Sequence, residues 1–323
     1  MKNTFNLQVL IVAASLGLAG YSCSNGTEKN VVVQAHRGGA ALFPENTIPA
    51  MINAVKIGTK TLELDLQITK DSQVVVSHDS YLNSLKVLYP NGEQVTCEEQ
   101  ETLQLFYMSY DSICKFDVGS LQNPLYPRRT NLPCVIPTLT NLIDCVEAYV
   151  YSSGSKTVNY NIEIKSAPEK DGVTTPDYRT FCDLSMEILL KKKLSGRLCI
   201  QSFDPRSLNY IHQKYPNVTL SYLVDNPYCS FEDYLKQLDF VPNIISPNYA
   251  IIDKDFVTAA HNCNMKVIPW TVDSQADVLR LKDMGVDEII TNQPDSVRIW
   301  LDNDSHDMQY SKAVAFYENL MGY

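Results

Sequence analysis

Short runs rich in β-branched and aliphatic residues alternate with amphipathic stretches along the chain from Val31 onward. This alternation predicts parallel strands that are joined by crossover helices. The strands that we expect lie at 31–35, 61–66, 160–164, 198–202, 219–223, 244–247, 266–270 and 287–290.

The stretches between these runs repeat their apolar positions with the period of a helix. The expected helices lie near 47–57, 138–151, 177–193, 205–214, 231–239, 253–263, 275–284 and 294–301. Asn46 is the expected N-cap of the first helix. Three glycines follow helices where a left-handed C-cap is common, namely Gly58, Gly196 and Gly285. Repeated strand–helix units of this number predict one α/β domain over 31–301, a (β/α)₈ TIM barrel.

One further apolar run, 73–77, does not fit as a barrel strand. Too few residues separate it from the strand at 61–66 for a parallel crossover, so we expect a hairpin that turns near Lys70. The hairpin would return His78 to the end of strand 61–66. Residues 80–137 then form a long insertion at the same, top face of the barrel, where loops usually shape access to a site.

The chain begins with a targeting segment that precedes the fold. Lys2 and an apolar stretch at 7–18 predict a signal peptide over 1–22. Cys23 follows directly, as in bacterial lipoproteins, so we expect an exported protein with a lipid on Cys23 that anchors it to a bacterial membrane, in the periplasm or at the cell surface. The alternative is ordinary cleavage with Cys23 incidental. No role is indicated for the tail at 302–323.

Composition and charge narrow the class of partner. Hydrophobic residues make up 45% of the 323 residues, as in a soluble globular protein, and the formal net charge is −10. This charge disfavours nucleic acid, because phosphate backbones are bound by an excess of Lys and Arg. A small anionic substrate needs only a few local cations, and a membrane contact is expected only through the N-terminal lipid.

The cysteines divide into two groups. Because an exported chain can form disulfides, the cysteines of the insertion are the expected candidates, namely Cys97, Cys114 and Cys134. Others are expected on apolar faces, where free cysteine behaves as a small hydrophobic residue, namely Cys145, Cys182 and Cys199. No spacing of Cys and His indicates zinc.

Acidic side chains gather on two neighbouring strands. Glu63 and Asp65 are two residues apart and therefore point to one face of their strand, toward the barrel interior. Glu163 and Lys165 repeat this spacing one strand over. Buried carboxylates need a neutralising cation, and three of them without thiolates indicate one divalent cation, Ca²⁺ or Mg²⁺. The alternative is a solvent-exposed acidic pair on an edge strand.

Two of the five histidines lie at strand or hairpin ends beside these carboxylates, namely His36 and His78. Two imidazoles in opposite protonation states can deprotonate a nucleophile and protonate a leaving oxygen at neutral pH. A single histidine at such a position is more often a structural hydrogen-bonding group, so the prediction depends on the pair.

The order of these motifs resembles that of the glycerophosphodiester phosphodiesterase family. The resemblance covers residues 31–297. The matching motifs are His36-Arg37-Gly38, Pro44-Glu45-Asn46-Thr47, Glu63-Leu64-Asp65, Thr69 with Asp71, Val76-Ser77-His78-Asp79, Ile136-Pro137-Thr138-Leu139, Glu163-Ile164-Lys165, Gln201-Ser202-Phe203 and Pro269-Trp270-Thr271-Val272.

The resemblance implies a distorted barrel and a role for each matching residue. The metal ligands of the family match Glu63, Asp65 and Glu163. Its acid–base pair matches His36 and His78.

Substrate contacts are implied in the same way. Arg37 and Lys165 match residues that contact the phosphate, Glu45 belongs to the expected substrate-binding set, and Trp270 matches an aromatic that packs on the glycerol end. A core tryptophan is the alternative for Trp270. Asn292 stands where the family often has Asp, and we expect this difference to leave the metal and histidine residues untouched.

The implied reaction is metal-dependent hydrolysis of glycerophosphodiesters to sn-glycerol 3-phosphate and an alcohol, with two-histidine acid–base catalysis. The alternatives are a phospholipase-D-like activity on lipids and a non-catalytic surface binding lipoprotein. The intact set of carboxylates and histidines favours an enzyme. The length of the insertion leaves the alcohol group open.

We predict that Cys23→Ser moves the protein from the membrane fraction to the soluble fraction without loss of catalysis, because only the lipid is removed. Cell fractionation with an activity assay of each fraction tests this. A serine variant that still sediments with membranes would contradict the lipid anchor.

Overall fold

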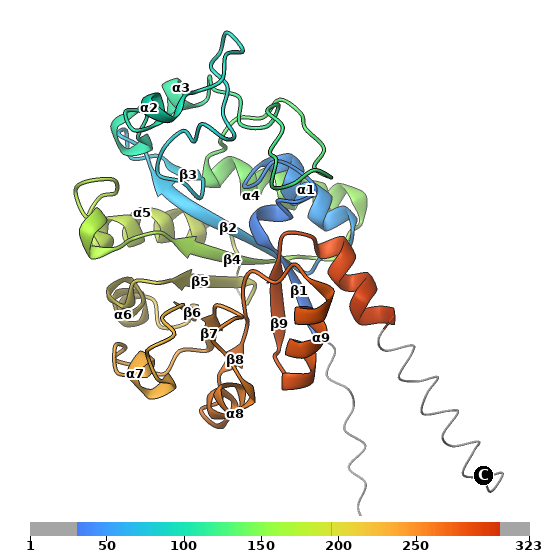
Figure 1. Cartoon of the computed structure of the whole chain (residues 1–323). Helices are drawn as coiled ribbons and strands as arrows, with labels where there is room; N and C mark the ends of the chain where they lie inside the picture. Colours follow the sequence, from blue (N-terminus) through green and yellow to red (C-terminus); the bar gives the residue numbers. More distant parts are fainter. Residues whose placement is uncertain (1–30, 195, 304–323) are drawn as a thin grey trace, which may run out of the picture.

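A nearly closed barrel of parallel strands is the centre of the computed structural model, which describes residues 31–194 and 196–303 (Figure 1). The hydrogen-bonded order is β8-β7-β6-β5-β4-β2-β1-β9. Residues 267–272 and β9 complete the circle with backbone bonds such as Ile290 N to Pro269 O at 3.0 Å. The barrel strands are β1 (Val32–Ala35), β2 (Thr61–Ile68), β4 (Asn159–Ile164), β5 (Leu198–Ser202), β6 (Thr219–Val224), β7 (Ile244–Pro247), β8 (Lys266–Val267) and β9 (Glu288–Thr291). The predicted barrel is confirmed.

One predicted strand is shorter than expected. β8 ends at Val267 and does not continue to residue 270. Pro269 carries no N–H group and therefore interrupts the ladder, after which Trp270 makes an isolated parallel bridge with Asn248.

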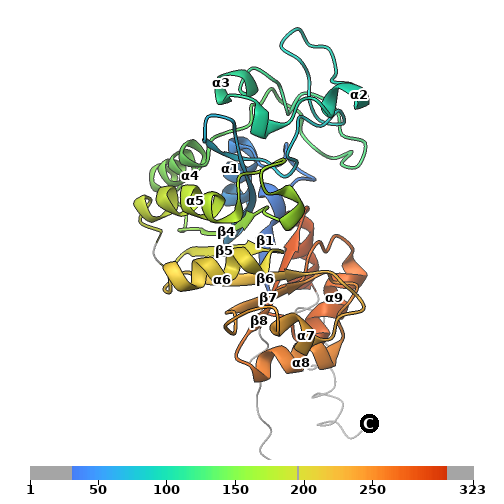
Figure 2. The same ribbon diagram turned by 90° about the vertical axis from the view of Figure 1, so that its left-hand side faces the viewer.

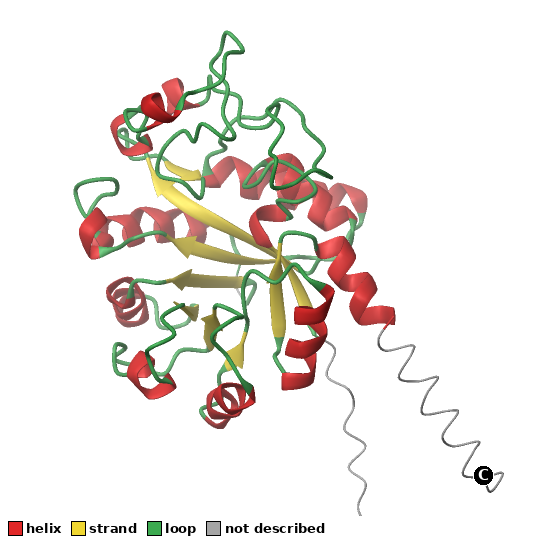
Figure 3. Cartoon of the chain, in the orientation of Figure 1, coloured by secondary structure: helices red, strands yellow, loops and turns green. Residues whose placement is uncertain are grey.

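Helices surround the outside of the barrel and alternate with its strands (Figure 3). They are α1 (Ile48–Lys56), α4 (Leu139–Ser153), α5 (Tyr178–Lys191), α6 (Pro205–Lys214), α7 (Phe231–Leu235), α8 (Lys254–Asn262) and α9 (Gln275–Met284), and residues 294–303 are helical. The expected left-handed glycines have positive φ, with +79° at Gly58, +74° at Gly196 and +90° at Gly285.

The expected N-cap of α1 is wrong. Thr47 caps the helix by accepting a bond from Ala50 N, whereas Asn46 has φ +58° and turns its side chain toward β2. The two residues are both good capping types, and a partner 19 residues away decides between them.

Alternation along β2 separates the core from the barrel interior. Leu62, Leu64 and Leu66 are fully buried and belong to the cluster that the helices cover. Glu63 and Asp65 lie on the opposite face of the strand, toward the barrel axis. The sequence of β2 therefore supplies packing on one side and charge on the other.

The extra strand β3 (Val74–Val76) forms the predicted hairpin. It pairs antiparallel with β2, with Leu66 opposite Val76 and Ile68 opposite Val74. The insertion that follows contains α2 (Cys97–Gln100), η2 (Leu105–Tyr107) and α3 (Tyr110–Ile113), and it stands above the barrel in Figure 2. It packs around an apolar cluster of its own, formed by Val75, Leu82, Val87, Val95, Leu105, Ile113, Phe116 and Ile136.

The disulfide prediction for the insertion is wrong. All the cysteines that the structure describes are free, including exposed Cys97 and buried Cys134. None of the described helices is both long and apolar enough to cross a membrane. The predicted signal peptide and Cys23 lie outside the described residues, as does the tail from 304 onward.

Candidate active site

A cavity of about 90 Å³ opens at the C-terminal ends of the barrel strands, where the sequence predicts the site. It is lined by His36, Arg37, Glu63, His78, Glu163, Lys165, Gln201, Phe203, Leu223, Trp270, Thr271 and Ile290. Most of the predicted site residues therefore face one cavity. Asp65 is fully buried and does not line the cavity, but it lies within ion-pair distance of Arg37 and Lys165, which do.

Three carboxylates form the floor of this site. Oxygens of Glu63, Asp65 and Glu163 all lie within 4.8 Å of one another, and the side chains are almost fully buried. The register explains this closeness, because Asp65 on β2 is directly opposite Glu163 on β4. Burial raises the pKa of Glu63 well above its usual value, and the charge of Asp65 adds to the shift.

Two cations compensate this negative charge in part. Lys165 Nζ lies 2.9 Å from Glu163 Oε1 and 3.3 Å from Asp65 Oδ1, and Arg37 Nε lies 3.4 Å from Asp65 Oδ2. Burial alone raises the pKa of Asp65, but Lys165 and Arg37 outweigh it and hold this pKa well below its usual value. Burial keeps the pKa of Glu163 raised despite Lys165. Three carboxylates against two cations therefore leave excess negative charge.

The donor set fits a hard divalent cation. It consists of carboxylate oxygens from two adjacent strands, without nitrogen or sulfur. The excess negative charge would be removed by an ion bound among the three oxygens.

Asn46 and Gln201 fix the orientation of these carboxylates, a role that sequence patterns indicated for neither residue. Asn46 Nδ2 donates to Asp65 Oδ2 at 2.7 Å. Gln201 Nε2 donates to Glu63 Oε1 at 2.9 Å. Gln201 in turn accepts from Asn161, which also donates to Gln34, so an amide chain continues down the barrel axis. Asn46 and Gln201 both lie inside motifs that resemble those of the family, and this position in the motifs was the sequence feature that could have indicated their role.

A tight turn after β1 delivers His36 and Arg37. η1 (His36–Gly38) carries positive φ at Arg37 (52°) and Gly38 (81°), followed by Gly39 (92°). In this conformation the backbone N–H of Arg37 donates to Glu63 Oε2 at 2.7 Å. A Cβ atom at Gly38 would lie 2.9 Å from the backbone carbon of Ala50, so no other residue fits.

His36 lies between an amide and a carboxylate. Its Nδ1 is 2.7 Å from Asn292 Oδ1, and its Nε2 is 3.9 Å from Glu63 Oε2. The expectation that Asn292 leaves the histidines untouched is therefore wrong, since it contacts His36 directly. Burial, helped by the charge of Arg37, lowers the pKa of His36 to about 3.

His78 has a carboxylate partner and is more exposed. Its Nδ1 lies 2.8 Å from Asp79 Oδ1. Lys86, a residue of the insertion, bridges Asp79 Oδ2 and Glu45 Oε1 at 2.7 Å each. Glu45 also accepts from Arg37 Nη1 at 3.0 Å. Burial by itself raises the pKa of Glu45, but Arg37 and Lys86 lower it to about 2. The insertion thus joins the surroundings of both histidines through Lys86, which sequence patterns did not indicate.

An apolar wall faces the charged groups. Trp270 and Phe203 make an edge-to-face contact with ring centroids 5.4 Å apart, and Leu223 and Ile290 extend the wall. Trp270 Nε1 donates to Ser246 O at 2.8 Å. The ring therefore borders the cavity and is not enclosed in the core.

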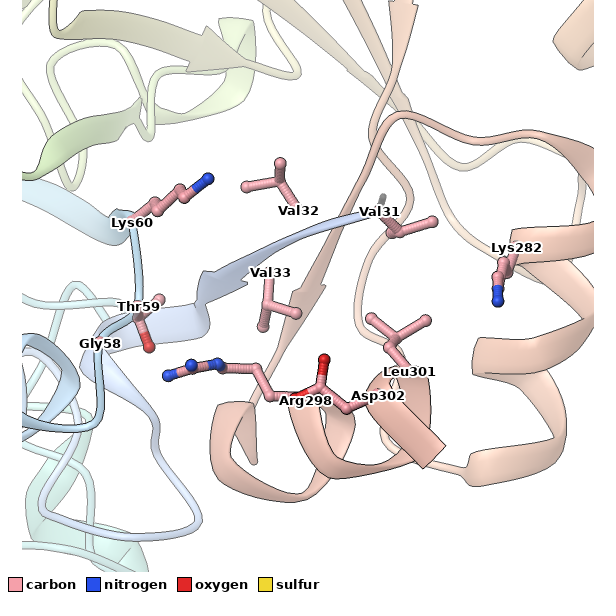
Figure 4. Close-up of a pocket in the computed structure, with 10 residues that line it drawn as sticks. All are labelled: Val31, Val32, Val33, Gly58, Thr59, Lys60, Lys282, Arg298, Leu301 and Asp302. Atoms are coloured by element: carbon pink, nitrogen blue, oxygen red, sulfur yellow. The ribbon is translucent and has the colours of Figure 1, made fainter. Parts of the chain in front are cut away.

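A larger cavity, of about 220 Å³, lies where the strands begin, at the other end of the barrel (Figure 4). Aliphatic side chains of Val31–Val33 line it together with the side chains of Lys60 and Arg298. Among the described residues that line it there is no histidine, and Asp302 is the one acidic residue. His36, His78, Glu63 and Glu163 line the smaller cavity instead.

A family model and several known proteins match most of this chain. The model of the "Glycerophosphoryl diester phosphodiesterase family" matches residues 36–296. A glycerophosphodiester phosphodiesterase of Bacillus subtilis (strain 168) is 31% identical over 271 residues, which are 82% of this chain and 84% of that protein. The human lysophospholipase D GDPD1 is 29% identical over 283 residues, 84% of this chain and 86% of its own.

Solved structures share the fold. An Oleispira antarctica phosphodiesterase in complex with the product sn-glycerol-3-phosphate has a TM-score of 0.67 at 21% identity, covering 84% of this chain and 96% of that chain. A glycerophosphodiester phosphodiesterase of Parabacteroides distasonis has a TM-score of 0.63 at 24% identity, covering 86% and 99%. These similarities support the barrel architecture.

We predict that Gly38→Ala destabilises the protein by about 1–3 kcal/mol and sharply reduces activity, because strain at positive φ adds to a backbone collision beside His36 and Arg37. Gly92→Ala is the matched control, since Gly92 has φ +88° with open space around it. Thermal unfolding and initial rates of both variants test this. Equal effects of the two substitutions would show that the contact with Ala50 is unimportant.

Proposed function

This chain belongs to the glycerophosphoryl diester phosphodiesterase family, and we propose that it hydrolyses glycerophosphodiesters to sn-glycerol 3-phosphate and an alcohol with one divalent cation and two catalytic histidines. The observation that carries the proposal is the convergence of three buried carboxylates, two histidines and two cations on one cavity. The Oleispira antarctica relative, solved with sn-glycerol-3-phosphate, supports the product class.

Glu63, Asp65 and Glu163 are the proposed ligands of Ca²⁺ or Mg²⁺. When bound, such a cation supplies positive charge that neutralises the phosphate and stabilises the charge of the transition state. Arg37 and Lys165 border the same cavity. We propose that their positive charges also stabilise the phosphate oxygens.

The contacts of the two histidines favour different roles. His36 touches a neutral amide, and burial keeps its pKa low, so the ring is neutral near pH 7 and suited to accept a proton from the attacking oxygen. The attacking oxygen belongs to water or to the 2-hydroxyl of the glycerol. His78 Nδ1 touches the Asp79 carboxylate at 2.8 Å, which orients the ring, and we assign His78 as the donor to the leaving alkoxide.

Trp270 and Phe203 form the proposed packing surface for the glycerol carbons, because they are the aromatic side chains that line the cavity. Glu45 binds Arg37 and Lys86, and we place it in the substrate site as the residue that orients Arg37 toward the phosphate.

A second candidate substrate is a lysophospholipid, which the similarity to human lysophospholipase D GDPD1 favours. Exposed apolar side chains on and near the insertion, such as Leu85 (51% exposed) and Leu125 (72%), would be available to an acyl chain.

We also propose that the protein is exported and lipid-anchored at Cys23. The support is the order of charge, apolar stretch and cysteine in residues 1–23, which lie outside the described part of the chain.

We predict that the two candidate substrates are separated by rates of choline release. Wild-type protein should release choline from glycerophosphocholine faster than from lysophosphatidylcholine, and a chelator should abolish both. Preference for the lysolipid would favour the second candidate. Unchanged hydrolysis under chelation would remove the metal from the proposal.

We predict that substitutions of the histidines and of the carboxylates impair different properties, namely turnover and metal binding. His36→Ala and His78→Ala should each lower kcat by about 10²–10⁴-fold with metal affinity nearly unchanged, because they only transfer protons. Glu63→Gln, Asp65→Asn and Glu163→Gln should weaken metal binding, and excess metal should partly restore their activity. Isothermal titration of Ca²⁺ or Mg²⁺ beside steady-state kinetics tests this.

The pH–rate profile separates the two histidines further. It should be bell-shaped, with the acidic limb lost in His36→Ala, because a proton acceptor must be neutral, and the alkaline limb lost in His78→Ala. The carboxylate substitutions are the controls that should keep both limbs.

If the histidine variants lose metal and the carboxylate variants keep it, the assigned roles are inverted.

A further inference from the structure

We infer that Asp273 and Asn292 are positioning residues that hold His36 in one tautomer, with the proton on Nδ1 and the lone pair of Nε2 facing the cavity. The inference rests on the proposed function, because it concerns the ring assigned there as the proton acceptor. Neither residue lines the cavity, and neither is among the proposed metal ligands.

Asp273 lies in the loop between β8 and α9 and uses both carboxylate oxygens. Its Oδ1 accepts from the backbone N of Asn292 at 2.9 Å and from Thr291 Oγ1 at 2.8 Å. Its Oδ2 accepts from Asn292 Nδ2 at 2.6 Å. Gln293 Nε2 donates to the backbone oxygen of Asp273, which ties the loop to the end of β9.

This contact decides which way the Asn292 amide points. A carboxylate can only accept hydrogen bonds, so the amide nitrogen must face Asp273. A reversed amide would place two oxygens 2.6 Å apart, without a proton between them. The Asn292 oxygen therefore faces His36.

The amide in turn decides the tautomer of His36. Asn292 Oδ1 lies 2.7 Å from His36 Nδ1, and because an amide oxygen only accepts, Nδ1 must carry the proton. The neutral ring then presents the lone pair of Nε2, the nitrogen that lies on the side of Glu63 at 3.9 Å. A ring in the other tautomer would present an N–H group there and could not accept a proton.

Asp273→Asn should reverse this tautomer. The backbone N–H of Asn292 still points at the position of Oδ1, so that position must remain an oxygen. The amide nitrogen of the new residue at 273 then faces Asn292, and the Asn292 amide turns so that its oxygen accepts from that nitrogen. The amide nitrogen of Asn292 now donates to His36 Nδ1, which moves the ring proton to Nε2.

Exchanging the two residue types should restore the arrangement. In the double variant Asp273→Asn/Asn292→Asp, the amide at 273 donates to the carboxylate at 292, and that carboxylate accepts the proton of His36 Nδ1. The single variant Asn292→Asp keeps an acceptor for Nδ1 but places two carboxylates in contact. It should therefore lose stability and keep the tautomer.

The test combines kinetics with ¹⁵N NMR of the histidine rings in the full-length protein, with His36 assigned from the His36→Ala spectrum. We expect Asp273→Asn to lower kcat on the order of 10²-fold, as for a misdirected base, with KM little changed. Its His36 shifts should indicate Nε2–H, while wild type, Asn292→Asp and the double variant indicate Nδ1–H. The double variant should recover part of kcat, with its acidic limb moved to higher pH, because a carboxylate beside Nδ1 favours the protonated ring. Asp295→Asn is the control for loss of a nearby exposed carboxylate.

Two results would overturn the inference. One is an Nδ1–H pattern in Asp273→Asn, and the other is a double variant whose kcat is no higher than that of Asp273→Asn. Failure of the proposed function is distinguishable, because an inactive wild-type protein would still give ring shifts that reveal the tautomer.

Discussion

The cost of burying three carboxylates side by side is the constraint on which the rest of the site depends. Glu63, Asp65 and Glu163 are brought together by parallel pairing of β2 and β4, so the barrel itself creates the crowding. Arg37 and Lys165 lower this cost only in part, and burial still raises the pKa of Glu63 and Glu163. The turn at 36–39 and the amides of Asn46 and Gln201 supply hydrogen bonds that keep the charges in place.

The two histidines beside these carboxylates differ in the charge of the group that each ring contacts. His36 is bound to an amide whose direction a carboxylate sets, and His78 is bound to a carboxylate that a lysine holds. Lys86 comes from the insertion, which has an apolar cluster of its own. The groups that distinguish the two rings therefore lie outside the barrel strands, while the three clustered carboxylates lie on strands β2 and β4.

Sequence patterns predicted the barrel strands, the β2–β3 hairpin and the carboxylates and histidines that line the cavity, because local periodicity and strand direction determine them. They failed where a residue distant in the sequence determines which contact a side chain makes. Asn46 is a good cap by type, but Asp65 captures its side chain, and Asn292 lies 256 residues from the His36 ring that it touches. The cysteine candidates of the insertion also failed, because all the cysteines that the structure describes are free.

The direction of β1 has a practical consequence. Val31 enters at the end of the barrel where the strands begin, and the cavity opens where they finish. Any attachment made upstream of Val31, whether an acyl chain in a bilayer or an affinity tag on a sensor chip, therefore joins the barrel at the end opposite the mouth of the smaller cavity. Immobilisation through the N-terminus therefore makes no attachment at the cavity mouth, which leaves the site open to freely diffusing small molecules.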